Sequence, residues 1–290
     1  MAENNTPLIV VGVDGSDDGL RAVRFGAGNA LDMGDDLLLV HAVDDAMLAG
    51  AWGVVYDPEV LQNAGATAND QAFEVAVAEG LPKERIRTEV VLGSPGGVLG
   101  RLSEVADLVV VGRRSVSGLE RMFVGSTSVS VVANASCPVV VISAASTPGP
   151  IGNKKLIGVG LNTSPGNHEV LDQAFNAAQR RGAELEILHI IQPPVGIFGP
   201  KFSPDDLEEQ IRFTRGGIKA VAKRVGKQYP DVKYKVEVVA DTPINELVNR
   251  SANYDMLVVG KSEGSIPGFG LGGLLRGLMA HAASPLLICH

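Results

Sequence analysis

The residues best suited to chemistry lie in one stretch, Asp107 to Val132, which reads DLVVVGRRSVSGLERMFVGSTSVSVV. Its apolar start, Leu108 to Val111, predicts a buried strand that ends at Gly112, and a helical spacing of apolar residues begins after Gly125. Glycine lets a backbone approach an anion closely, and the free N–H groups at a helix N-terminus favour phosphate. The stretch therefore predicts a phosphate-binding loop between a strand and a helix.

A second polar turn, Gly12 to Ser16, follows the first apolar run of the chain. We interpret Asp14 in this turn as an acceptor that orients a ligand or caps the turn, in preference to a catalytic carboxylate. Three arginines of the first stretch carry guanidinium groups that suit phosphate oxygens, although loop arginines are also commonly solvated. They are Arg113, Arg114 and Arg121.

These residues must be positioned by strands that alternate with helices. Such alternation predicts parallel βαβ units and an α/β fold with a doubly wound, five-stranded parallel sheet covered on both faces. If the first and fourth strands are neighbours, the turn at Asp14 and the loop at Gly112 face one crevice. The predicted strands of the first half are Leu8 to Val13, Leu37 to Val43, Ile86 to Leu92, Leu108 to Val111 and Val139 to Ile142.

Three helical patterns connect the first four strands. One follows Ser16, a long alanine-rich one spans Asp57 to Glu79, and a third begins at Pro95 with Ser94 as its N-cap. The predicted buried stripe of this third helix consists of Val98, Leu99, Leu102 and Val105.

The same pieces recur in the second half of the chain. Six landmarks each return 148 residues later, which predicts a tandem duplication with almost no net insertion. The linker is Ser146 to Pro150, and the predicted domains are residues 1–147 and 148–290. The landmark pairs are Gly12-Val13-Asp14 with Gly160-Leu161-Asn162, His41 with His189, Pro95 with Pro243, Asp107-Leu108 with Asp255-Met256, Gly112 with Gly260, and Gly125 with Gly273.

The glycine spacing of the loop resembles the G-2x-G-9x-G-[S/T] signature of ATP-binding universal stress proteins. Gly112, Ser115, Gly125 and Ser126 occupy its positions, and Ser115 stands where the family usually has its second glycine. A serine hydroxyl can donate to a phosphate, so we expect weakened rather than abolished binding. The resemblance covers essentially the whole chain as two copies.

The resemblance implies a fold, an assembly and a set of binding residues. It implies two flavodoxin-like (Rossmann-like) domains whose fifth strands, Val139 to Ile142 and Leu286 to Ile288, pair in an intramolecular pseudo-dimer that forms a homodimer. In that family the early aspartate binds the adenine and ribose side, the end of the second strand lines the adenine pocket, and the loop wraps the ribose and phosphates. The implied ATP site, with or without Mg²⁺, comprises Gly12, Asp14, Val40, Gly112, Arg113, Arg114, Ser115, Gly118, Gly125, Ser126 and Thr127.

The second copy departs further from the signature. At the offset of 148, Asn162 replaces Asp14, Glu263 replaces Ser115, and Leu274 replaces Ser126. A carboxylate repels phosphate and leucine cannot donate, so the second site is predicted to be degenerate, although Gly264 can take the glycine role by a shift of one residue. The weaker candidates of this copy are Asn162, Gly260, Gly264 and Gly273.

Composition excludes several classes of protein. The 290 residues are 45% hydrophobic and 20% charged, which is typical of globular domains, and the formal charge of −8 argues against broad binding to nucleic acid or anionic membranes. There is no apolar run long enough to span a membrane and no signal-peptide pattern. Cys137 and Cys289 lack CxxC spacing, and His41 and His189 lack a second ligand at metal spacing, so we expect no metal site and a cytoplasmic protein.

Three functions remain open. The first is a nucleotide-dependent regulator of stress or dormancy that binds ATP without turning it over and acts on a regulatory protein partner. The second is a slow ATPase or transferase, which would need a base near the γ-phosphate; Asp17 and Asp18 fit better in the first turn of a helix. The third is a nucleotide-free scaffold whose sites have decayed. Trp52, in an apolar loop, would cover the nucleotide or a partner, or be buried against its own domain.

Overall fold

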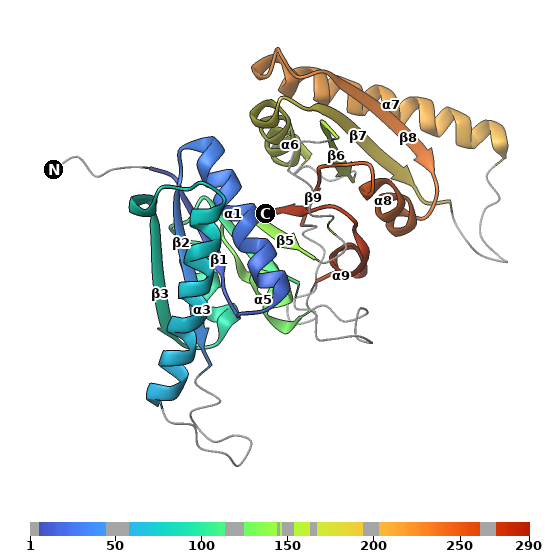
Figure 1. Ribbon diagram of the computed structural model, residues 1–290. Coiled ribbons are helices and arrows are strands. Elements are labelled where there is room, and N and C mark those ends of the chain that lie inside the picture. Colours follow the sequence, from blue (N-terminus) through green and yellow to red (C-terminus); the bar gives the residue numbers. More distant parts are fainter. Residues whose placement is uncertain are drawn as a thin grey trace. The chain divides into compact units, whose positions relative to one another are not determined.

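The computed structural model describes residues 6–44, 58–113, 125–143, 146, 154–162, 167–193, 203–261 and 271–290. The chain forms two compact units, one built mainly from residues up to 144 and the other mainly from residue 145 onward. In both units parallel strands are flanked by helices, which confirms the predicted α/β class (Figure 1). None of the described helices is long and apolar enough to cross a membrane.

The first unit contains a parallel sheet in the order β3-β2-β1-β4-β5. The predicted neighbourhood of the first and fourth strands is confirmed, because Val11 of β1 pairs with Val110 of β4. The strand order therefore reverses beside β1. The elements are β1 (Leu8–Gly12), α1 (Asp17–Met33), β2 (Asp36–Val43), α3 (Pro58–Ala78), the 3₁₀ helix η1 (Lys83–Arg85), β3 (Ile86–Leu92), α4 (Pro95–Leu102), β4 (Leu108–Gly112), α5 (Ser126–Asn134) and β5 (Val139–Ile142).

Helix α1 begins and ends at residues with clear capping chemistry. The Oγ of Ser16, its N-cap, accepts a hydrogen bond from the N–H of Gly19 at 3.1 Å, and two acidic residues in the first turn favour the positive end of the helix dipole. Gly34 closes the helix at φ 78°, a left-handed conformation that suits glycine. The capped start fixes the first turn of α1 at the edge where the parallel strands end.

The predicted burial of α4 residues is confirmed for Val98 and Leu99 and is wrong for Val105. The helix ends at Leu102, so Val105 falls in the turn that follows it, where its side chain is 71% exposed. Apolar periodicity continued past the end of the helix, and the sequence carried no stop signal there.

The second unit repeats this arrangement. Its parallel strands lie in the order β8-β7-β6-β9-β10, the counterpart of the first order. The elements are β6 (Leu156–Leu161), α6 (Asn167–Arg181), β7 (Glu184–Ile191), α7 (Pro204–Val225), the 3₁₀ helix η2 (Gly226–Gln228), β8 (Tyr234–Ala240), α8 (Pro243–Ser251), β9 (Met256–Gly260), α9 (Gly273–His281) and β10 (Leu286–Cys289).

The offset between the copies changes from 148 to 147 after β9. The β7–β8 register repeats the β2–β3 register at 148, but α9 and β10 begin 147 residues after α5 and β5. The N-cap of α5 is Gly125 and that of α9 is Gly272. The predicted correspondence of Gly125 with Gly273 is therefore wrong: Gly272 corresponds to Gly125, and Gly273 corresponds to Ser126.

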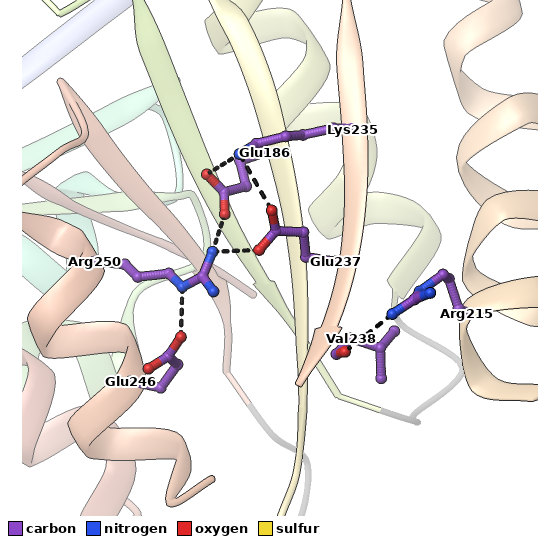
Figure 2. Close-up of polar contacts among 7 residues, drawn as sticks. All are labelled: Glu186, Arg215, Lys235, Glu237, Val238, Glu246 and Arg250. Atoms are coloured by element: carbon purple, nitrogen blue, oxygen red, sulfur yellow. Dashed lines mark hydrogen bonds and ion pairs between the residues drawn. The ribbon is translucent and has the colours of Figure 1, made fainter. Parts of the chain in front are cut away.

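The two units differ where α4 or α8 packs on the sheet. In the second unit, Arg250 of α8 pairs with Glu186 of β7, with Glu237 of β8 at 2.6 Å, and with Glu246 of its own helix at 2.6 Å. Figure 2 shows these four side chains together with Lys235, whose Nζ lies 3.2 Å from Glu186. We call these five residues the ionic cluster. The positions of Glu186, Glu246 and Arg250 correspond to Leu38, Val98 and Leu102 in the first unit.

Candidate functional site

The candidate site lies at the carboxyl ends of β1, β2 and β4. The N–H of Val13 donates to the carbonyl of Val40 at 2.8 Å, which ties the residue after β1 to the end of β2. The N–H of Arg113 donates to the carbonyl of Ile142 at 2.6 Å, which ties the residue after β4 to the end of β5. Because ligands of doubly wound sheets bind where the strand order reverses, this edge beside β1 is the place to expect one.

Asp14 is exposed and held in a fixed orientation by its own turn. Its Oδ1 accepts hydrogen bonds from the N–H of Ser16 at 3.0 Å and from the Oγ of Ser16 at 2.6 Å. Gly15 makes the turn at φ 75°, and a Cβ added to Gly19 would lie 2.6 Å from the same Oδ1. The carboxylate therefore sits over the first turn of α1, which matches the predicted role of a turn cap and leaves it at the strand edge.

Gly112 is where β4 meets α1. A Cβ added there would lie 2.5 Å from the backbone carbonyl carbon of Asp18 and 2.7 Å from the N of Gly19. The close approach therefore places the end of β4 beside the first turn of α1, which follows the Asp14 turn. It also gives Gly112 a packing role that is independent of any ligand.

Two other predicted residues of the first copy are part of the sheet. Gly12 is half-buried at the end of β1, where Leu99 of α4 approaches it. Val40 is 1% exposed and pairs with Gly12. Its side chain belongs to the core, so the end of β2 offers a ligand mainly its backbone and the residues that follow.

Arg113 is buried next to an acidic residue that the sequence analysis assigned only to a helix turn. Its side chain is 4% exposed, while Asp18 is completely buried and pairs with Arg21 at 2.6 Å. Burial raises the pKa of the Asp18 carboxyl, and the hydrogen bond to Arg21 and the charge of Arg113 oppose that rise. The presence of an acid three residues before an arginine in the first helical turn was the available signal for this cluster.

The N-terminus of α5 is the predicted phosphate side of the site. Gly125 is its N-cap in an extended conformation, and its carbonyl accepts hydrogen bonds from the Oγ of Ser128 at 2.9 Å and the N–H of Val129 at 3.2 Å. Ser126 is exposed, Thr127 is half-buried, and the first turn contains no acidic residue. The N–H groups of a helix's first turn have no partner within the helix, so this end can accept an anion.

The middle of the loop lies outside the described residues. It contains Arg114, Ser115, Gly118 and Arg121. Trp52, in a different loop, also lies outside the described residues. Their predicted roles stay predictions.

The second copy carries a different set of groups at the same edge. Asn162 is exposed and its carbonyl accepts a hydrogen bond from Asn167 at 2.6 Å, while a Cβ at Gly260 would meet only the Cγ2 of Val170, at 2.7 Å. Lys261 stands where the first copy has Arg113, and burial lowers its pKa. Gly273 is the first residue of α9, and Gly264 lies outside the described residues.

His41 and His189 lie at the same position on β2 and β7 but make different contacts. The Nδ1 of His189 lies 2.9 Å from the carbonyl of Leu161, the last residue of β6. His41 packs instead against Gly65 of α3, where a Cβ would lie 2.7 Å from its ring. Both histidines therefore make contacts within their own units.

Comparison with known proteins gives one consistent result. A model described as "Universal stress protein family" matches residues 7–143 and again residues 154–290. A universal stress protein of Mycobacterium tuberculosis is 30% identical over 299 residues, covering 97% of this chain and 96% of that protein. One of Mycolicibacterium smegmatis is 30% identical over 292 residues, with the same coverage of each chain. The crystal structure of a universal stress protein from Archaeoglobus fulgidus matches the fold with a TM-score of 0.68 at 17% identity, covering 99% of this chain and 98% of that one.

Proposed function

The chain belongs to the universal stress protein family, and from this premise we propose that its first unit binds ATP at the carboxyl edge of β1 and β4. One observation carries the proposal. Gly112 packs directly on the backbone of Asp18 and Gly19, and so brings the strand end that opens the loop next to the oriented carboxylate of Asp14. Two polar segments almost a hundred residues apart in the sequence thus share one edge.

Each group of residues in the proposed site contacts a different part of the nucleotide. The Asp14 carboxylate accepts hydrogen bonds from the adenine and ribose side, and the end of β2 after Val40 borders the base. The N–H groups of Ser126 and Thr127 at the start of α5 donate to phosphate oxygens. Arg114, Ser115 and Gly118 complete the loop around the phosphates, with Mg²⁺ as an optional companion. Arg113 contributes positive charge from within the domain, because its side chain is buried beside Asp18.

Binding rather than catalysis is the proposed chemistry. Among the described residues, the acids assigned above to this edge are Asp14, bonded to Ser16, and Asp18, bonded to Arg21. Both are engaged within the protein, which does not favour either as a base that activates water. We therefore favour a nucleotide-dependent regulator of stress or dormancy over a slow ATPase, with the nucleotide shifting the population of a surface that a regulatory partner recognises.

The second unit has the weaker site in this proposal. Asn162 offers an amide in place of a carboxylate, and α9 begins with Gly273 and Leu274 instead of Ser126 and Thr127. The first difference removes a negative charge, and the second removes two hydroxyl side chains from the start of the helix. We expect one nucleotide per chain.

We also propose domain bounds, an oligomeric state and a cellular compartment for the chain. The working domains are residues 1–147 and 148–290, the chain forms a homodimer, and it acts in the cytoplasm. Cys137 and Cys289 are free, buried thiols, which suits a reducing compartment.

Titration calorimetry with ATP tests the proposed site. Wild type should bind, Asp14→Ala should weaken affinity at least tenfold because a charge-assisted acceptor is lost, and Asn162→Ala, the matched change in the second copy, should leave affinity unchanged. Equal loss in both variants, or none in either, would contradict a site in the first unit. Phosphate release measured with the same samples separates binding from hydrolysis.

A further inference from the structure

Helix α7 carries an exposed face with an unusual order of residues. Its inner face packs on β8, and Ile218, Ala222 and Val225 are buried there. The opposite face includes Phe213, which is 83% exposed. Single exposed apolar residues are common, so Phe213 alone would mean little. The residues beside it on the same face of the helix are what suggest a contact surface.

The residues in line with Phe213 form one continuous stripe. Alternating steps of three and four residues keep positions on a single face of a helix, as in the contact seam of a coiled coil. Helix α7 has exposed residues at all six such positions. We call them the outward stripe: Asp206, Glu209, Phe213, Gly216, Ala220 and Lys223.

The outward stripe is complementary to itself when reversed. Two α7 helices that run antiparallel about a two-fold axis between residues 214 and 215 would place Phe213 opposite Gly216 of the second copy. The same axis places Asp206 opposite Lys223. Gly216 and Gly217 have no atom within 4 Å of an added Cβ, so the surface opposite each phenyl ring is open backbone. The Phe213 side chain of each copy therefore faces the exposed glycine backbone of the other copy, as a two-fold symmetric contact requires.

The charges of α7 follow the same reversal. Four acidic residues lie at positions 205, 206, 208 and 209, whereas Lys219, Lys223 and Arg224 lie in the last two turns. In an antiparallel pair, the acidic end of each helix would lie beside the basic end of the other. The corresponding helix α3 carries Glu59, Asp70 and Glu74 as its charged residues, all acidic, and has no such complementarity.

We propose that the outward stripe of α7 is a docking surface for α7 of a second copy of this chain. The proposal rests on the homodimer named in the proposed function and not on nucleotide binding. It assigns Phe213 as the central apolar contact and the two helix ends as the groups that fix an antiparallel register.

Sedimentation velocity over a range of protein concentrations tests this surface. We expect wild type to form dimers, and Phe213→Glu to raise the dimer dissociation constant about 30-fold or more, because a central anchor becomes a charge facing bare backbone. Val105→Glu is the matched control, since Val105 is also exposed but lies in the first unit. It should leave dimerisation unchanged.

A charge reversal gives a second readout that does not depend on Phe213. Lys223→Glu should weaken the dimer, because the new carboxylate lies opposite Asp206 of the second copy, and Lys223→Arg should leave dimerisation unchanged. Asp206 is left unchanged because its carboxylate also caps the helix with Ser203.

Three outcomes separate this proposal from the proposed function. A dimer unaffected by both Phe213→Glu and Lys223→Glu would overturn the α7 surface and leave the homodimer itself standing. A wild type that stays monomeric would overturn both. ATP affinity should be the same in Phe213→Glu as in wild type, so a failed ATP site would show independently in the calorimetry.

Discussion

Gly112 shows how one residue serves packing and the proposed site together. The spacing of the loop predicted it as a place where backbone approaches phosphate. In the structure, the backbone that approaches it is that of Asp18 and Gly19. The glycine is thus needed for α1 to reach the strand edge, which in turn sets the Asp14 turn near the end of β4.

Substitution of Gly112 by alanine should destabilise the protein by about 1–3 kcal/mol, because the new methyl group meets rigid backbone and α1 must shift. Gly260→Ala is the matched change in the second unit. It meets a methyl group of the Val170 side chain and no backbone atom within 4 Å, and should cost less. Urea unfolding of the full chain measures both, and equal costs would contradict the packing role assigned to Gly112.

Residue-level prediction from sequence succeeded where chemistry is local and failed where it depends on three-dimensional proximity. Ser94 as the N-cap of α4 and the first-turn positions of Asp17 and Asp18 follow from helix chemistry alone. The burial of Arg113 beside Asp18 does not, because the two residues are 95 positions apart and meet only when β4 packs against α1.

At the scale of elements, strands were predicted well because buried parallel strands are short, uninterrupted Val and Leu runs. The change of offset to 147 was missed because Gly268, Gly270, Gly272 and Gly273 offer several equivalent glycines, and only the start of α9 shows which of them is the N-cap. The predicted burial of Val105 was wrong for a related reason, because apolar periodicity does not mark where a helix ends.

The ionic cluster is the main difference in packing between the two units. Removing Arg250 alone should be costly, because Glu186 is 4% exposed and would keep a buried charge with its strongest partner gone. We expect Arg250→Leu to destabilise the protein by about 3–5 kcal/mol. The triple variant Glu186→Leu, Glu246→Val, Arg250→Leu, which copies the residues of the first unit, should be close to wild type or more stable. Urea unfolding at neutral pH measures both variants.

Acid should destabilise wild type more than it destabilises the triple variant. The hydrogen bond from Arg250 holds the pKa of Glu237 below its usual value of 4.5. A carboxyl whose pKa is lowered by folding contributes stability above its unfolded pKa and loses it as the pH falls through the folded pKa. Wild type should therefore lose stability more steeply below about pH 4.5 than the triple variant. Parallel pH profiles of the two proteins would contradict the pairing of Glu237 with Arg250.

At the scale of the whole molecule, duplication has produced two units with the same strand order and different surfaces. The first unit keeps the polar turn, the oriented carboxylate and the serine and threonine at the start of α5. The second replaces those groups and has instead a helix, α7, with a self-complementary outer face. We therefore propose nucleotide binding for the first unit and self-association for the second.

The proposed ATP site is tested most directly by identifying and counting the nucleotide released when freshly purified protein is denatured. Chromatography should find ATP at close to one per chain in wild type and in Asn162→Ala, and little in Asp14→Ala. A value near two would show that the second unit also binds. No nucleotide in any sample, together with no binding when ATP is added back, would contradict the proposed function and leave a scaffold whose sites have decayed.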